Sequence, residues 1–190
     1  MSTTIFVFMM MNFAYIGLLP KIFFRRDGKF NLKWWLTASP FFASSLLVAL
    51  YYFDFLTPWY AQKFSALAEV VAAVLSAASI SLISYTLGTH RQRLALWHQQ
   101  NDRPQNIVTE GAYKYIRHPF YAAFILALLA MVVLCASPWT LAVGLTGLLM
   151  LNHTAAGEER RLQASEFGEE YKNYLRRSGR FFPQWHRSAR

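Results

Sequence analysis

The feature that most limits how this chain can fold is a series of apolar runs of near membrane-crossing length. A helix needs about 20 mostly apolar residues to cross a bilayer. Five runs approach this length, over residues 3–19, 34–53, 65–89, 119–136 and 139–151. We therefore predict an all-α polytopic membrane protein with about five transmembrane helices.

The bulk composition agrees with this class. Hydrophobic residues make up 55% of the 190 residues and charged residues only 15%, against about 25% charged in soluble domains. The length predicts a single domain over residues 1–190, with N-terminal spans in 1–64 and a core in 65–190. Neither Lys nor Arg precedes the first apolar run, unlike a secretory leader, so we treat that run as structural.

The net charge of +9 raises the possibility of nucleic-acid binding, but its distribution argues against it. The basic residues lie in short segments between apolar runs, as they do beside anionic membrane lipids. With five spans, one side of the bilayer receives every Lys and Arg except Lys63. The positive-inside rule then places the N-terminus outside and the C-terminus in the cytoplasm. Anionic lipids are the predicted partners, and no obligate protein partner is indicated.

Two helices have distinctive patterns. Residues 65–89 are rich in Ala and Ser, which permit close helix approach in lipid, so we expect this helix to lie centrally. Residues 155–177 place apolar side chains near helical spacing among Glu and Arg, which predicts an amphipathic helix on the cytoplasmic face. Between the last two spans, Ser137 and Pro138 predict a tight helical hairpin.

The densest polar and aromatic stretch runs over residues 109–121. Pro119 stands where a helix is expected to begin, because proline suits a first helical turn. A helix N-terminus offers N–H groups and partial positive charge to an anion, and Arg117 and His118 precede this one directly. We interpret the stretch as the rim of a small-molecule site at a membrane surface.

Several residues near this rim allow two interpretations. Glu158 and Glu159 are either a solvated acidic pair or carboxylates that face a ligand. Arg117 either reaches lipid phosphate or contacts the ligand. Asn152 and His153 form an interfacial cap or line the site. Tyr113, Tyr115 and Tyr121 are belt aromatics or a stacking surface. The scattered histidines and single cysteine show no metal-ligand spacing, and no phosphate-binding glycine loop occurs.

The combination of these motifs resembles the isoprenylcysteine carboxyl methyltransferase family, which groups with membrane phospholipid N-methyltransferases. The similarity covers about the C-terminal half, from Gly88 onward. It consists of Gly-x-Tyr-x-x-x-Arg-His-Pro-x-Tyr at residues 111–121, Glu-Glu at 158–159, Phe-Gly-x-x-Tyr at 167–171 and a closing Phe-Pro at 182–183. The first two spans carry no such motif.

The resemblance implies an S-adenosylmethionine-dependent methyltransferase with a cytoplasmic cofactor pocket and a lipophilic acceptor that enters from the bilayer. Transferred position by position, it implies these cofactor-binding residues: His98, Gln105, Asn106, Ile107, Val108, Tyr113, His118, Pro119, Phe120, Tyr121 and Glu159, with 105–108 resembling a strand. It implies that the Arg117–His118 rim pairs with the methionine carboxylate of the cofactor and that Glu159 accepts its ammonium. The catalytic candidates are Arg117, His153 and Glu158, the last two as bases for an amine acceptor.

One position departs from the family pattern. Ala155 stands where the prenylcysteine enzymes carry an Arg that holds the acceptor. The resemblance therefore implies cofactor binding more directly than it implies a prenylcysteine substrate. Two alternatives from other classes are a membrane reductase that uses a nicotinamide cofactor, and a non-enzymatic protein that binds anionic lipid. The joint presence of residues 117–119 and 158–159 favours the methyltransferase.

Overall fold

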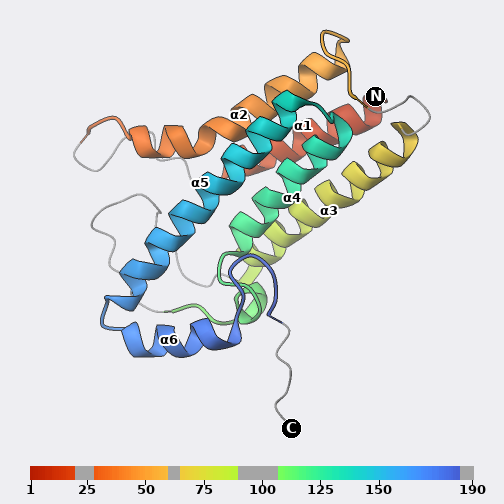
Figure 1. The fold of residues 1–190 in the computed structure, drawn as a ribbon. Coiled ribbons are helices and arrows are strands. Elements are labelled where there is room, and N and C mark those ends of the chain that lie inside the picture. Colours follow the sequence, from red (N-terminus) through yellow and green to blue (C-terminus); the bar gives the residue numbers. More distant parts are fainter. Residues whose placement is uncertain (20–27, 60–64, 90–106, 185–190) are drawn as a thin grey trace.

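The computed structural model describes residues 1–19, 28–59, 65–89 and 107–184. Its elements, in chain order, are α1 (Thr3–Leu18), α2 (Leu32–Tyr52), α3 (Ser65–Thr89), the short 3-10 helix η2 (Gly111–Lys114), α4 (Pro119–Leu134), α5 (Pro138–Gln163) and α6 (Gly168–Arg177). No strand occurs in these described ranges, which confirms the all-helical class; one isolated parallel bridge joins Ile116 and Gly179. Figure 1 shows α1 to α5 as an elongated bundle with α6 across one end.

The centre of the bundle is α4, not α3 as we expected from composition. Helix α4 contacts α1, α2, α3 and α5, and it lies between α5 and α3 in Figure 1. Most of its residues are buried, because it is apolar on every side. Helix α3 buries only one stripe, and Val70, Val74 and Tyr85 are exposed on its other side. The small residues of α3 thus give one close contact face rather than a central position.

Helix α3 also packs against α1 through a narrow polar seam. The buried hydroxyls of Ser76 and Ser79 donate to Met9 Sδ at 3.0 Å and to Asn12 Oδ1 at 3.2 Å. All four side chains are fully buried. Small side chains let the two helices approach closely enough for these bonds.

The hairpin between α4 and α5 is confirmed. Ser137 caps α5 in a reciprocal capping box with Thr140, and Pro138 occupies the first turn. Helix α4 likewise begins at Pro119, as predicted.

The C-terminal end of α3 lies close to η2. Gly111 has φ +58°, and a Cβ there would lie 2.2 Å from Thr89 Cγ2. A glycine is therefore required where η2 meets α3.

The C-terminal region differs from the single helix predicted over residues 155–177. Helix α5 continues past its apolar part to Gln163, and α6 begins only at Gly168. Between them, Ser165 Oγ donates to the Leu162 carbonyl and accepts from the Phe167 amide. Serine side chains compete with helical backbone bonds in this way, so the helix is divided at Ser165.

The length and composition of the described helices fit a bilayer in part. Trp34–Tyr52 and Ser65–Thr89 are long and apolar enough to cross a membrane, and Thr3–Gly17 and Pro119–Leu134 are shorter apolar helices. The number of five spans and the cytoplasmic position of α6 stay predictions.

Candidate functional site

A short backbone pairing brings the two ends of the C-terminal half together. We call residues 178–182 the C-terminal strap. The Gly179 amide donates to the Tyr115 carbonyl at 3.0 Å, and the Arg117 and His118 amides donate to the Gly179 and Arg180 carbonyls at 2.8 and 3.1 Å. Gly179 allows the strap to turn, because a Cβ there would overlap the Phe182 carbonyl oxygen. The strap therefore lies directly against the Arg-His-Pro rim.

The centre of the site is Glu159, whose side chain is only 6% exposed. Arg117 Nε donates to Glu159 Oε1 at 2.9 Å. From the strap, Arg180 donates Nε to Oε1 at 3.2 Å and Nη2 to Oε2 at 2.5 Å. Residues 117, 159 and 180 thus come from three separate segments, and two guanidinium groups hold one buried carboxylate.

Glu159 lies on α5 beyond the apolar part of that helix. Its ion pairs determine whether its carboxyl group is charged. Burial alone would raise the pKa of this carboxyl group. The contacts with His118, Arg180 and Arg117 outweigh burial, so the pKa lies well below its ordinary value. Glu159 is therefore a fixed negative charge at every physiological pH.

His118 and Tyr121 contact the second carboxylate of the pair, that of Glu158. Tyr121 Oη donates to Glu158 Oε1 at 2.8 Å, and His118 Nδ1 lies 3.5 Å from Glu158 Oε2. The two rings are parallel, with centroids 5.3 Å apart. His118 Nε2 is 3.4 Å from Glu159 Oε1, but it is buried and has no well-aligned hydrogen-bond partner among the described residues. A buried polar atom in this state calls for a ligand or a water molecule.

Arg117 hydrogen-bonds to more groups of the protein itself than the sequence indicated. Besides Glu159, its Nη1 donates to the carbonyls of Ser178 and Leu175, the latter at 3.4 Å. These carbonyls belong to the last turn of α6 and the residue that ends it, where a cation is favourable. Arg117 therefore connects α4, α5 and α6, and few of its donors face outward.

The tyrosines of residues 109–121 separate into different environments. Tyr174 Oη donates to the Tyr113 carbonyl at 2.6 Å, which ties α6 to η2. Burial raises the pKa of Tyr174 to about 12 and raises that of Tyr113 as well. Tyr115 is exposed. Tyr113 and Tyr121 are thus part of the site region, whereas Tyr115 faces outward.

The other predicted site residues fall into three groups. Pro119 and Phe120 are buried at the start of α4. Ile107 and Val108 are half-buried but have irregular backbone, not the strand-like form we expected. His153 is exposed on α5 and makes no hydrogen bond or ion pair with the described part of the chain, so the structure does not bring it into the cluster. His98, Gln105 and Asn106 lie outside the described residues.

Sequence reasoning missed Arg180 altogether. Its Nη1 also donates to Asn152 Oδ1 at 2.8 Å, so it reaches the residue that follows the apolar part of α5. No motif marks Arg180, because its role depends on the pairing of the strap with residues 115–118. The one sequence feature that pointed to this contact was the polar pair Asn152 and His153 at the end of an apolar run. Of these two residues, Asn152 joins the cluster and His153 does not.

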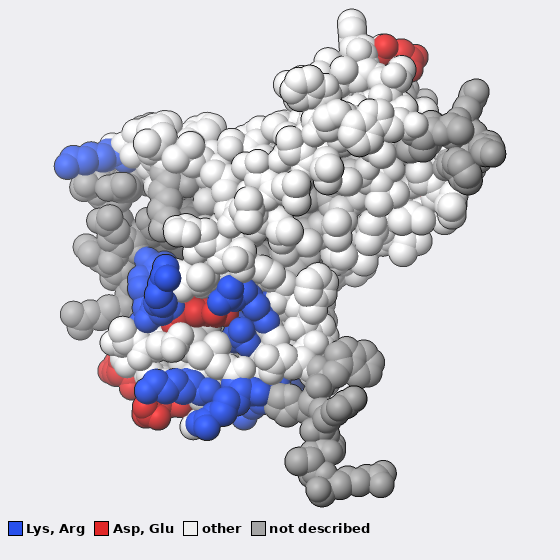
Figure 2. Space-filling model, viewed as in Figure 1, with Lys and Arg blue, Asp and Glu red and all other residues white. Residues whose placement is uncertain are grey.

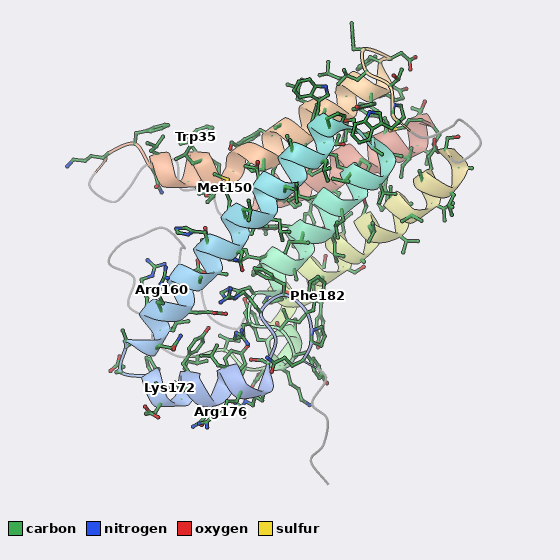
Figure 3. All side chains as sticks on the ribbon, viewed as in Figure 1. Trp35, Met150, Arg160, Lys172, Arg176 and Phe182 are labelled. Atoms are coloured by element: carbon green, nitrogen blue, oxygen red, sulfur yellow. The ribbon has the colours of Figure 1, made fainter. Side chains whose placement is uncertain are left out.

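The electrostatic pattern of the surface reflects this arrangement. Figure 2 shows basic and acidic atoms gathered around α6 and the adjoining end of α5, with acidic atoms between basic ones, while most of the bundle on that face is uncharged. In Figure 3, Arg160, Lys172 and Arg176 lie on the outer sides of α5 and α6. In this cluster Glu158 and Arg180, whose side chains are 20% and 33% exposed, offer a carboxylate to a cation and a guanidinium group to an anion.

The chain matches the model of a known protein family. The model of the isoprenylcysteine carboxyl methyltransferase (ICMT) family matches residues 70–164, which include the Arg-His-Pro rim and both glutamates. No curated protein was found that matches the chain.

Proposed function

This chain belongs to the isoprenylcysteine carboxyl methyltransferase family, and from that premise we propose that it transfers a methyl group from S-adenosylmethionine to a lipophilic acceptor at the cytoplasmic face of a membrane. Membership implies a methyltransferase, and together with two apolar helices of sufficient length it indicates an integral membrane protein. The cofactor, the acceptor and the membrane face are the proposed parts.

One observation carries the proposal. The Arg-His-Pro rim and the Glu-Glu pair are about 40 residues apart in sequence, yet Arg117 Nε and Glu159 Oε1 are 2.9 Å apart. His118 contacts both carboxylates, at 3.5 and 3.4 Å. Two motifs characteristic of the family thus form a single polar cluster beside an apolar bundle.

The charged and polar groups of this cluster fit the proposed cofactor. S-adenosylmethionine carries an ammonium, a sulfonium and a carboxylate. Glu158 and Glu159 offer negative charge to its cationic groups, and aromatic faces such as that of Tyr121 also favour cations. His118 Nε2, which is buried and has no well-aligned hydrogen-bond partner among the described residues, offers a further polar contact. We propose that His118, Pro119, Phe120, Tyr121, Tyr113 and Glu159 bind the cofactor, together with Ile107, Val108 and residues 98, 105 and 106.

The bound cofactor would supply an electrophilic methyl group, and the protein supplies position and dryness. Transfer from a sulfonium to an anion cancels charge, so a site of low dielectric favours it over water. Alignment of two bound reactants can contribute roughly 7–11 kcal/mol. The low exposure of the Arg117 and Glu159 side chains, 9% and 6%, supports a site with little water around these two groups.

The placement in the membrane follows from charge and length. We propose that α1 to α5 span the bilayer, with the N-terminus outside and the cluster, α6 and the strap in the cytoplasm. Two long and two shorter apolar helices support part of this count. The excess of Lys and Arg on one side supports the orientation.

An amine acceptor would need a base, whereas a carboxylate or thiolate would not. Glu158 is the better placed of the predicted bases, because it bonds Tyr121 and contacts His118, while His153 is exposed on α5.

Calorimetric titration of the purified chain with S-adenosylmethionine tests the proposal. We expect His118→Ala to weaken binding at least tenfold and Glu159→Ala to weaken it strongly, with Lys172→Ala on the exposed side of α6 as a control. Thermal unfolding of each variant shows whether the fold is retained. Unchanged affinity in both site variants would contradict the site, and binding of a nicotinamide dinucleotide instead would indicate a reductase. Incubation with radiolabelled methyl donor and a membrane lipid extract would then identify the acceptor.

A further inference from the structure

We propose that four exposed aromatic side chains, at the end of the bundle opposite the candidate site, anchor the protein in the boundary between the head groups and acyl chains of a lipid leaflet. We call them the aromatic patch; they are Phe53, Phe55, Trp59 and Trp139. The inference goes beyond methyl transfer and rests on the proposed spans alone. It is carried by the backbone that holds these side chains, by their exposure and by the length of α4.

The connection that follows α2 has a fixed backbone. The amides of residues 55 and 56 both donate to the Leu50 carbonyl, at 2.9 and 3.3 Å, and Asp54 before them has φ +59°. Aspartate is one of the few residues that visit this left-handed conformation. Further along, the Trp59 amide donates to the Ala136 carbonyl at 2.9 Å. The connection is therefore tied to the hairpin between α4 and α5, and in Figure 1 both lie at the end of the bundle away from α6.

The aromatic patch is exposed and almost uncharged. Phe53, Phe55 and Trp59 come from the connection and Trp139 from the first turn of α5, and the four residues are between 62% and 74% exposed. Within the described segments 53–59 and 135–139, Asp54 is the only charged residue. On the face drawn in Figure 2, the described residues at this end show uncharged and acidic atoms but no basic ones. Large exposed apolar patches of this kind mark contact with a membrane or with another protein.

The surroundings of the patch favour lipid over a protein partner. Exposed apolar side chains continue from it along two helices, through Leu67 and Val70 on α3 and through Leu141 and Leu145 on α5. Acyl chains that cover these two helices therefore reach the patch as well. Tryptophan has an apolar ring and a polar N–H, and it concentrates where the membrane meets water for this reason.

The length of the central helix explains why an anchor is needed at this end. Helix α4 has 16 residues, which at 1.5 Å per residue cover about 24 Å. The hydrocarbon core of a bilayer is about 30 Å thick. With its site end at one boundary of the core, α4 stops short of the other boundary. The patch adds apolar surface where α4 ends, and interfacial aromatic side chains of this kind set the depth of a bundle.

Quenching of tryptophan fluorescence by brominated lipid tests the depth of the patch. The full chain is placed in phosphatidylcholine bilayers whose acyl chains carry bromine either near the ester end (shallow) or near the methyl end (deep). For Trp59→Phe and Trp139→Phe, we expect the emission lost relative to wild type to be quenched about twofold more by shallow than by deep bromine. Leu145→Trp, at an exposed position in the apolar part of α5, is the matched control and should add emission that deep bromine quenches more. Thermal unfolding of each variant shows whether the fold is retained.

The outcomes separate this inference from the proposed spans and from the proposed activity. Lipid quenching of Leu145→Trp without lipid quenching of Trp59 and Trp139 would overturn the inference alone. Absence of lipid quenching at all three positions would overturn the proposed spans with it. Emission of Trp59 that is quenched by acrylamide in water but not by lipid, or by neither, would place the patch in water or against a protein, and both results contradict the anchor. Titration with S-adenosylmethionine does not depend on the patch, so failure of the proposed activity appears there.

Discussion

Two regions of the molecule, the seam between α1 and α3 and the site cluster, bury polar groups in opposite ways. In the seam between α1 and α3, neutral groups meet through single bonds, Ser79 Oγ to Asn12 Oδ1 at 3.2 Å and Ser76 Oγ to Met9 Sδ at 3.0 Å. Asn12 Nδ2 is buried without a hydrogen-bond partner in the described part of the chain. In the site cluster, two arginines surround one carboxylate. A neutral amide can stay partly unsatisfied, but a buried charge needs a partner.

The largest effect should come from breaking the charged cluster. Glu159→Gln leaves two guanidinium groups without their carboxylate, and loss of one partner of a buried pair costs about 3–5 kcal/mol. We expect the free energy of unfolding in mixed micelles to fall by at least about 3 kcal/mol. Glu166→Gln, at an exposed glutamate between α5 and α6, should cause no measurable change. Equal losses in the two variants would show that the cluster adds no stability.

The same carboxylate predicts a pH dependence. The pKa of Glu159 is lower in the folded chain than in the unfolded chain. Its contribution is therefore fully present above the ordinary carboxyl pKa of about 4.3 and is lost as pH falls from there toward the folded value. Unfolding measured from pH 7 to pH 3 should show wild type losing stability below about pH 4.3. Glu159→Gln should lack that part of the decline, and parallel curves would contradict the assignment.

An intermediate effect is expected where α3 meets η2, between the two regions. Gly111→Ala would place a Cβ 2.2 Å from Thr89 Cγ2 at φ +58°. We expect a loss of about 2 kcal/mol from strain and overpacking. Gly88, on α3 next to Thr89, is the control position, because no atom lies within 4 Å of a Cβ placed there. Gly88→Ala should leave the stability unchanged or raise it slightly. If both variants unfold alike, the close approach of Gly111 to Thr89 does not require a glycine.

The smallest effect should come from the neutral seam. Ser79→Ala removes the hydroxyl that donates to Asn12, and such bonds between membrane helices average about 0.6 kcal/mol. We expect a loss of this size in mixed micelles. Ser81→Ala, an exposed serine on the same helix, is the control. A loss as large as that of Glu159→Gln would remove the contrast between the two regions.

The sequence predicted those parts of the structure that depend on local pattern. The all-helical class, the start of α4 at Pro119 and the hairpin at Ser137 follow from apolar length and capping chemistry. The central helix was predicted wrongly, because small residues indicate close approach but not the number of neighbours. Composition gave no means to choose between the Ala- and Ser-rich α3 and the uniformly apolar α4.

The site was predictable to the extent that motifs marked it. His118, Tyr121 and the two glutamates, which the motifs mark, lie close together. Arg117 was expected to face a ligand, but its guanidinium is mostly taken up by Glu159 and the end of α6. Arg180 could not be predicted, because the pairing of the strap with residues 115–118 involves backbone groups that carry no side-chain pattern.

The pairing of the strap also sets an order of assembly during synthesis. Arg180 leaves the ribosome after Arg117 and Glu159, and it lies 21 residues beyond Glu159. Until then the rim lacks its backbone bonds to the carbonyls of Gly179 and Arg180. A chain truncated after α6 would keep its bundle helices but lack the bonds between the C-terminal strap and residues 115–118. The polar end is thus the last part of the described structure to be completed.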